Sequence, residues 1–239
     1  MIKSPPSLVS SCLSLDPKSY LPVENVFHLL SIKERFIFEQ RNYKTDLRRR
    51  QFVYGRLLLK QLVHSQLNIE IQSISIAASD AGAPSLIVDG LVVDNVGLSI
   101  AHYANTVFGA VGLYCRCGVD VQAVSGVDWS AVLRVMDWSV SFDDQWLGIS
   151  PEPRHENYVS PQLRSALIWS GYEAWFKCNG GDVTPSDFRL HHVELLQKDS
   201  VTHVSIFQMV LACDTSYTAY CIYLKVSSGE IFAVATSAF

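Results

Sequence analysis

Apolar residues recur at helical spacing in two stretches of the first third of the chain. The first stretch covers residues 22–40, and a second, longer one covers residues 46–67. This periodicity is typical of helices that bury one face, so we predict a helix over each stretch. The second helix is expected to bury a stripe made of Phe52, Leu57, Leu58, Leu62 and Val63.

From residue 71 the pattern changes to the alternation that is typical of half-buried strands. Glycine, proline and aspartate interrupt it where the chain is expected to turn. The expected elements are strands over 71–77, 85–90, 98–102, 107–114 and 118–122, with turns over 79–85 and at the CRCG segment, 115–118.

The second half of the chain repeats the order of helices followed by strands. Helices are expected at 129–138 and 161–178, and the second has Ser160 as its N-cap, Pro161 in its first turn and Asn179-Gly180-Gly181 at its end. Strands are expected over 189–196, 203–213, 217–226 and 230–236. Helices followed by strands, twice, predict an α+β protein of two similar halves joined near residues 118–126.

Composition narrows the class of protein. The 239 residues are 49% hydrophobic and 18% charged, which suits one large globular domain or two packed halves. A net charge of −4 gives the whole chain no reason to bind nucleic acid. No apolar run has the length of a membrane helix, and proline and serine interrupt the N-terminal segment too early for a signal peptide. We expect a cytoplasmic monomer whose six cysteines are reduced and mostly buried.

The window 41–60 differs from the rest of the chain in its charge. It holds seven basic residues and the single acid Asp46. One interpretation is a solvated helix face. The other is a local patch for a phosphorylated ligand or an acidic protein partner.

Two acidic positions are candidates for chemistry. In the strand GVDVQ, Asp120 and Gln122 point to the face opposite Val119 and Val121, so one face can pack while the other holds a ligand. Together with Glu173 on the later helix they could supply oxygen ligands to Mg²⁺. The alternative is that Asp120 is a turn or cap residue and that Glu173 and Lys177 form an ordinary i,i+4 ion pair.

Other motifs are missing or weak. The chain has no Gly-x-Ser-x-Gly elbow, no Gly-x-Gly-x-x-Gly after the first strand and no P-loop, which argues against hydrolase, dinucleotide-binding and P-loop functions. His191 and His192 are neighbours on an expected strand, so we expect them on opposite faces.

The order of the segments points to one family. QFVYGRLLLK is followed by Gly82-Ala83-Pro84, then by VGLSIAHYANTVFGAVG, GVDVQ and WSGYEAWFK. This order resembles the two-lobed, surfactin-type 4'-phosphopantetheinyl transferases. Their hallmarks are Gly-Lys-Pro, an Asn-x-Ser-His-Ser-like strand, Gly-Val/Ile-Asp-Val/Ile-Glu and Trp-Ser/Thr-x-Lys-Glu-Ala/Ser-x-x-Lys. The resemblance spans roughly residues 31–236.

The resemblance implies a fold of two pseudo-twofold-related halves, each a mainly antiparallel sheet packed with helices. The halves would be residues 1–118, on the coenzyme A side, and 119–239, with the metal-binding helix and strands, packed as one unit. Enzymes of the family transfer the phosphopantetheine arm of coenzyme A to a serine of an acyl or peptidyl carrier protein and release 3',5'-ADP. Such carrier proteins serve polyketide, nonribosomal peptide or fatty-acid synthesis.

The resemblance also implies roles for individual residues. Glu173 and Lys177 would be catalytic, Glu173 as the base for the carrier serine and Lys177 at the leaving phosphate. His102 would contact the 3'-phosphate of coenzyme A. The implied ligands of Mg²⁺ are Asp120, Gln122 and Glu173, and the implied coenzyme A-binding residues are His102, Arg49, Arg50, Gly82 and Pro84.

The chain departs from the family pattern at positions where the family places charge: Gln51, Ala83, Gln122 and Tyr172. Each lost cation facing phosphate removes a charge-assisted hydrogen bond of about 1.5–3 kcal/mol. An alternative function therefore stays open, that of a diverged family member that binds carrier proteins, or acts on a carrier-tethered intermediate, without transferring the arm. A small-molecule enzyme unrelated to carrier proteins is a further alternative.

Overall fold

The computed structural model describes residues 7–16, 20–78, 82–136, 146–150, 152–211 and 220–238. It is an α+β structure that contains antiparallel and mixed sheets. The chain divides into two compact units. Unit 1 comprises Met1–Val119 and Ser237–Phe239, and unit 2 comprises Asp120–Thr236.

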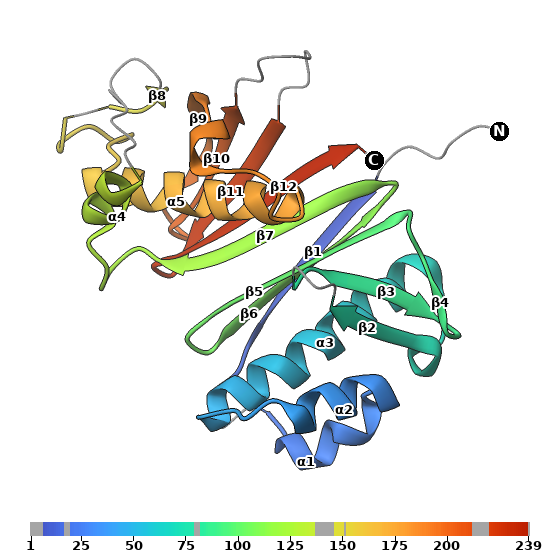
Figure 1. Cartoon of the computed structure of the whole chain (residues 1–239). Coiled ribbons are helices and arrows are strands. Elements are labelled where there is room, and N and C mark those ends of the chain that lie inside the picture. The colour runs from blue at the N-terminus through green and yellow to red at the C-terminus, as the bar shows by residue number, and fades with distance from the viewer. Residues whose placement is uncertain are drawn as a thin grey trace. The chain divides into compact units, whose positions relative to one another are not determined.

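Unit 1 contains two three-stranded sheets and a central helix (Figure 1). One sheet has the order β1-β6-β5 and the other the order β2-β3-β4. The helical segments are α1 (Val23–Val26), η1 (Phe27–Leu29), α2 (Ile32–Gln40), α3 (Asp46–Leu67) and η2 (Ile71–Ser73). The strands are β1 (Ser7–Ser14), β2 (Ile74–Ala78), β3 (Pro84–Val88), β4 (Leu91–Val92), β5 (Val96–Tyr103) and β6 (Thr106–Leu113).

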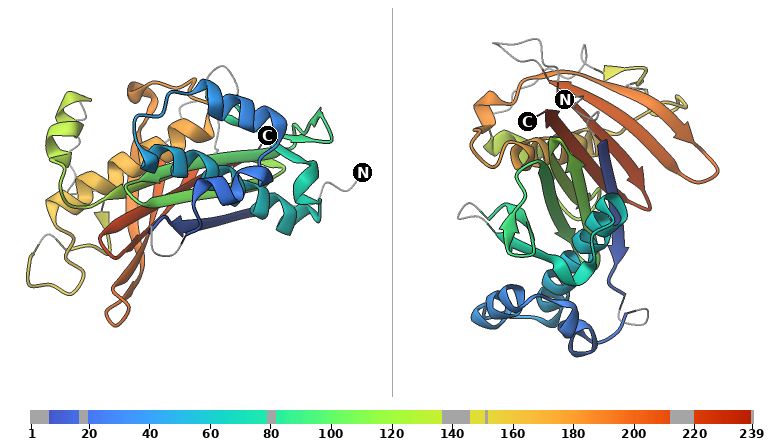
Figure 2. Two further views of the ribbon diagram at one scale, coloured as in Figure 1. Left: turned by 90° about the horizontal axis from the view of Figure 1, so that it is seen from below. Right: turned by 90° about the vertical axis from the view of Figure 1, so that its right-hand side faces the viewer.

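Helix α3 has the predicted bounds and packs on strands β1, β5 and β6 (Figures 1 and 2). Of its predicted stripe, all but the half-buried Leu57 are buried. The helix approaches β5 closely at Gly55, where an added Cβ would lie 2.3 Å from Cδ1 of Ile100. Because no side chain separates the helix from the strand there, the polar residues that precede Gly55 on α3 come close to the end of β5.

The predicted helix over 22–40 is wrong in its continuity. The chain forms α1 and η1, then starts α2 anew at Ile32. Ser31 is the N-cap of α2, and its hydroxyl accepts a hydrogen bond from the backbone N–H of Glu34, while the Glu34 carboxylate accepts one from the backbone N–H of Ser31. This reciprocal capping box ends one helical segment and begins the next.

The predicted CRCG turn is also wrong. Residues 115–118 begin strand β7 (Cys115–Ala123), and the turn lies one residue earlier, at Tyr114, whose φ is 56°. The cysteine side chains are buried, and that of Cys117 donates to the carbonyl of Ala110.

Strand β1 was not predicted, and it pairs along its full length with β6.

Unit 2 is built on a six-stranded sheet with the order β7-β12-β11-β10-β9-β8. Residues from Asp120 onwards of β7 belong to this unit. The remaining strands are β8 (Trp146–Leu147), β9 (Leu190–Asp199), β10 (Val204–Leu211), β11 (Tyr220–Ser227) and β12 (Glu230–Ala238). The helical segments are α4 (Trp129–Val135), α5 (Pro161–Cys178) and η4 (Pro185–Asp187). The predicted end of the helix at 129–138 and the predicted strand ends within 212–219 lie outside the described residues.

Helix α5 crosses one face of this sheet (Figure 1). Its bounds match the prediction, with Ser160 as N-cap and Pro161 in the first turn. The buried face of α5 includes Gly171, where an added Cβ would lie 2.6 Å from Sδ of Met209 on β10. The close packing at Gly171 fixes how far the helix stands from the sheet.

We expect Ser160→Ala to destabilise the protein by about 1 kcal/mol, because the backbone N–H of Leu163 loses its only described side-chain acceptor. Urea unfolding followed by tryptophan fluorescence measures this change. Ser160→Asp retains a capping oxygen and should behave like the unmodified protein. Equal losses in the two variants would contradict a capping role.

The strand that carries His191 and His192 differs from the prediction. Their rings do not lie on opposite faces: the two Nδ1 atoms are 2.7 Å apart. The register between β9 and β10 shifts here, since Val210 pairs with His192 and Leu211 pairs with Leu190. The extra residue, His191, forms a bulge that turns both rings to one side.

Candidate functional site

Unit 1 holds a cavity of about 370 Å³ that is lined by cations and aromatic rings. It lies where the first half of α3 meets β2, the start of β3 and the end of β5. Its cationic side chains are Arg41, Arg48 and Arg56, its aromatic ones are Tyr43 and Phe52, and the imidazole of His102 also lines it. Among the described residues that line it there is no carboxylate. A pocket of this composition favours an anionic ligand with a flat or apolar part.

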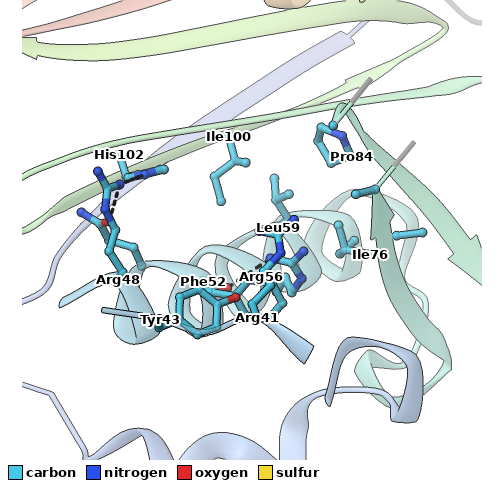
Figure 3. A pocket seen from close by; sticks show the side chains of 14 residues that line it. Arg41, Tyr43, Arg48, Phe52, Arg56, Leu59, Ile76, Pro84, Ile100 and His102 are labelled. Atoms are coloured by element: carbon cyan, nitrogen blue, oxygen red, sulfur yellow. Dashed lines mark hydrogen bonds between the residues drawn. The ribbon is translucent and has the colours of Figure 1, made fainter. Parts of the chain in front are cut away.

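At one end of the cavity, Arg48 lies beside His102 (Figure 3). The Arg48 guanidinium donates to Nε2 of His102, which therefore accepts, and to Oε1 of Gln51 at 3.0 Å. Gln51 in turn donates through Nε2 to the carbonyl of Ala104 at 2.8 Å. This network holds a cation next to His102, although position 51 itself carries an uncharged side chain.

Arg56 stacks on an aromatic ring in the middle of the cavity (Figure 3). Its Cζ lies 3.4 Å from the centroid of the Phe52 ring, and its Nε is buried without a hydrogen-bond partner among the described residues. Burial lowers the pKa of Arg56 to about 10. A cation that is this poorly solvated gains from an anionic partner, so Arg56 marks the part of the cavity where a negative group binds best.

Some of the predicted coenzyme A-binding residues line this cavity and others do not. His102, Gly82 and Pro84 line it. Arg49 instead pairs with Glu24 at 3.1 Å, and Arg50 pairs with Asp46 at 2.7 Å.

The three arginines that line the cavity belong to the basic window 41–60, for which a patch that binds a phosphorylated ligand was one of two interpretations, but none of the three was predicted to bind coenzyme A. The spacing i, i+4, i+8 of Arg48, Phe52 and Arg56 puts them on one stripe of α3, and this pattern is the signal that could have found them.

Unit 2 brings together the predicted carboxylates and Lys177. Asp120 lies on β7, and Glu173 and Lys177 lie one turn apart on α5. The Lys177 ammonium donates to Oδ1 of Asp120 at 2.9 Å, and it lies 3.8 Å from Oε2 of Glu173. The Asp120 side chain is 3% exposed, whereas that of Lys177 is 29% exposed. One edge of the cluster is therefore buried in the unit and the other faces solvent.

Burial controls the protonation of both acids. It raises the pKa of Asp120, and the nearby Lys177 opposes this rise. The pKa of Glu173 is also raised, mainly by burial. Lys177 opposes this rise, and the negative charge of Asp120 adds to it. A carboxylate whose pKa lies above its ordinary value is a stronger base, so burial makes Glu173 a better proton acceptor than an exposed glutamate.

The cluster offers oxygen atoms of the kind that a hard divalent cation binds. Oδ2 of Asp120 is buried without a close hydrogen-bond partner among the described residues, although the side chain of Gln122 and the backbone N–H of Val121 lie near enough to this carboxylate to lower its pKa. Gln122 is half-buried two residues further along β7, on the same side as Asp120. Two carboxylates and an amide oxygen are ligands that Mg²⁺ accepts. Within the described parts of the chain, no group of three or more His, Cys, Asp or Glu residues is arranged to hold a metal ion.

Comparison of the chain with models of known protein families and with curated proteins gave no match. In the described residues no helix is long and apolar enough to cross a membrane.

The remaining departures from the transferase pattern have distinct surroundings. Tyr172 is buried in an aromatic cluster, with its ring centroid 5.5 Å from that of Phe188 and 6.2 Å from that of Trp175. A lysine at this position would lose that packing. Ala83 is half-buried between Gly82 and Pro84, two residues that line the cavity.

Proposed function

We propose that the chain is a 4'-phosphopantetheinyl transferase, which moves the phosphopantetheine arm of coenzyme A to a serine of an acyl or peptidyl carrier protein. The observation that supports this most is the cluster of Asp120, Glu173 and Lys177, whose members come from a strand and a helix far apart in the sequence. We also propose that the α+β structure is the two-lobed fold of that family.

The cavity of unit 1 supports the same proposal. Coenzyme A carries a 3'-phosphate, a diphosphate and an adenine ring, and the cavity offers arginines, a histidine and aromatic rings, with no acid among the described residues that line it. In this proposal Arg48 supplies the positive charge that the family has at the position of Gln51, because its guanidinium donates both to Gln51 and to His102. Arg56 and Arg41 supply further positive charge.

In the proposed reaction the hydroxyl oxygen of the carrier serine bonds to the phosphorus that bears the pantetheine arm. The bond from that phosphorus to the bridging oxygen breaks, and 3',5'-ADP leaves with the electron pair. Glu173, or a water that it orients, accepts the serine proton, and Lys177 donates to the leaving phosphate. Mg²⁺ held by Asp120, Gln122 and Glu173 would neutralise charge on the diphosphate.

The second candidate is the diverged family member that binds carrier proteins without transferring the arm. The uncharged Gln122 beside Asp120 and the buried Tyr172 favour it, because both replace charged residues of the family pattern. The two candidates differ in one product, 3',5'-ADP.

The test is to incubate the protein with coenzyme A, Mg²⁺ and an apo-carrier protein and to quantify 3',5'-ADP by chromatography. The proposal predicts release that requires the apo-carrier, equals the amount of holo-carrier formed and stops when a chelator is added. If an active family member releases 3',5'-ADP under the same conditions and this protein releases none, the transferase proposal is wrong and the second candidate replaces it.

Arg56→Gln should weaken the binding of 3',5'-ADP by about 10-fold, because the buried guanidinium loses its charge-assisted contact with phosphate. Isothermal titration of the variant measures this change. The matched control is Arg49→Gln, which removes an arginine of the same helix that pairs with Glu24 outside the cavity. An equal loss of affinity in both variants would show that only the general charge of α3 matters.

A further inference from the structure

Unit 1 has a second cavity, of about 530 Å³, which the proposed transfer reaction does not use. It lies where η1 and the first turn of α2 face η2, β2 and β3. Six of its fourteen lining residues are aliphatic: Leu29, Leu30, Ile32, Ile71, Ile74 and Ile87. Its volume lies within the range of about 300–1,000 Å³ that is typical of sites for small ligands.

The charged groups at this cavity have one sign. Lys33 and Arg35 line it, and the described residues of its wall include no carboxylate. Lys60 also lines it, but its ammonium is already bound to Oε2 of Glu34 at 2.8 Å and to the carbonyl of Leu29 at 3.0 Å. Lys60 therefore needs no further partner.

Arg35 differs from Lys60 in this respect. Its Nε is buried and has no hydrogen-bond partner among the described residues. Glu34, the acid next to it in sequence, is fully buried and engaged by Lys60 and by the backbone N–H groups of Ser31 and Ile76. A buried donor on a cationic side chain is costly to leave unpaired, so a ligand that brings an acceptor is favoured there.

The mouth of the cavity is apolar as well. Ile32 is 80% exposed and Leu29 is 40% exposed, so aliphatic surface extends from the interior to the rim. An aliphatic chain with an anionic end satisfies both features, since the chain covers the leucines and isoleucines while the anion meets Arg35 and Lys33.

We propose that this cavity binds a single-chain anionic amphiphile, an aliphatic chain of medium length that ends in a carboxylate. The proposal is independent of the transferase function. It rests on the aliphatic lining, the unpaired Nε of Arg35 and the absence of acids from the described wall.

The test is isothermal titration of the full chain with decanoate and, in parallel, with decyltrimethylammonium, which has the same tail and the opposite charge. Decanoate should bind to one saturable site, and the cationic amphiphile should bind at least about 10-fold more weakly. Absence of saturable decanoate binding, or equal binding of the two amphiphiles, overturns the proposal.

Variants locate the site. Arg35→Gln should weaken decanoate binding by about 10-fold, and Gln72→Trp, which adds bulk at an exposed position of the wall, should weaken it as well. Arg116→Gln makes the same change of charge at an exposed arginine that does not line the cavity, and it should leave the affinity unchanged. Each variant is first checked for an unchanged melting temperature. If Arg35→Gln binds decanoate as the unmodified protein does, the proposed site is wrong.

Discussion

Replacing Asp120 by asparagine is expected to lower the rate of holo-carrier formation by about 100- to 1,000-fold. The substitution keeps the size of the side chain but removes its buried negative charge. In the unmodified protein this charge pairs with Lys177, and Oδ2 of the same carboxylate is the proposed metal ligand. The rate is followed by the mass of the carrier protein over time at saturating Mg²⁺. The matched control is Asp182→Asn, an exposed acid of the same unit, which should leave the rate unchanged.

The stability of this variant separates a lost reaction from a lost fold. Because burial raises the pKa of Asp120 in the folded state, the folded protein holds the proton to higher pH than the unfolded chain does. The contribution of Asp120 to stability therefore falls as the pH rises through the interval between the two pKa values. Asp120→Asn removes this contribution, so its melting temperature at pH 8 should equal or exceed that of the unmodified protein. If Asp120→Asn melts at a much lower temperature than the unmodified protein, the role of Asp120 is structural and not catalytic.

The largest effect on stability is expected from Glu34→Gln, with a loss of about 3–5 kcal/mol in the free energy of unfolding. Glu34 and Lys60 are fully buried, with 0% and 1% of their side chains exposed, and their charged atoms are 2.8 Å apart. Glutamine leaves the ammonium of Lys60 buried without its counter-charge. Urea unfolding followed by far-UV circular dichroism measures the loss, and every tryptophan of the chain lies at position 129 or later, so fluorescence reports unit 2 separately.

Two further variants test whether the unpaired charge is the cause. Glu34→Gln combined with Lys60→Met removes both charges and should recover a large part of the lost stability. Asp46→Asn breaks the more exposed pair with Arg50 and should cost no more than about 1 kcal/mol. If the double variant is as unstable as Glu34→Gln alone, the loss comes from the capping and strand contacts of Glu34 and not from Lys60.

Local signals predicted the helices where the sequence marks both ends. Helix α5 has a serine cap and a proline before its first apolar residue and Asn179-Gly180 after its last, so its bounds follow from the sequence. The break at Ser31 is also marked in the sequence, by Ser-x-x-Glu, but the prediction of one helix over 22–40 rested on apolar periodicity alone and did not use this signal. Periodicity alone cannot tell one helix from two that share a buried side.

The strands show where local signals are insufficient. The segment CRCG contains glycine and two cysteines and resembles a turn, but the cysteine side chains pack inward and the strand begins before them. Strand β1 has a partly exposed, serine-rich sequence, and it is a strand because it pairs with β6. Pairing with a strand about a hundred residues away leaves no mark in the local pattern.

Some residues of the candidate site could also be predicted from the sequence, and others could not. The approach of Lys177 to Asp120 was implied by the resemblance to the transferases, because each residue lies in a motif. The roles of Arg48 and Arg56 in the unit 1 cavity were not implied, since Arg48 lies outside the motifs and Arg56 lies in QFVYGRLLLK without a role assigned by the resemblance. Their position at the cavity depends on the close packing of α3 on β5 at Gly55. Arg49 and Arg50 directly follow Arg48 on α3, but they pair with Glu24 and Asp46 and do not line the cavity.

Intact-mass spectrometry of an apo-carrier protein after incubation with this protein, coenzyme A and Mg²⁺ tests the central claim most directly. The transferase proposal predicts a mass gain of one phosphopantetheine arm, which is absent with Asp120→Asn and with Glu173→Gln. An unchanged mass, beside a full gain produced by an active family member under the same conditions, would contradict it.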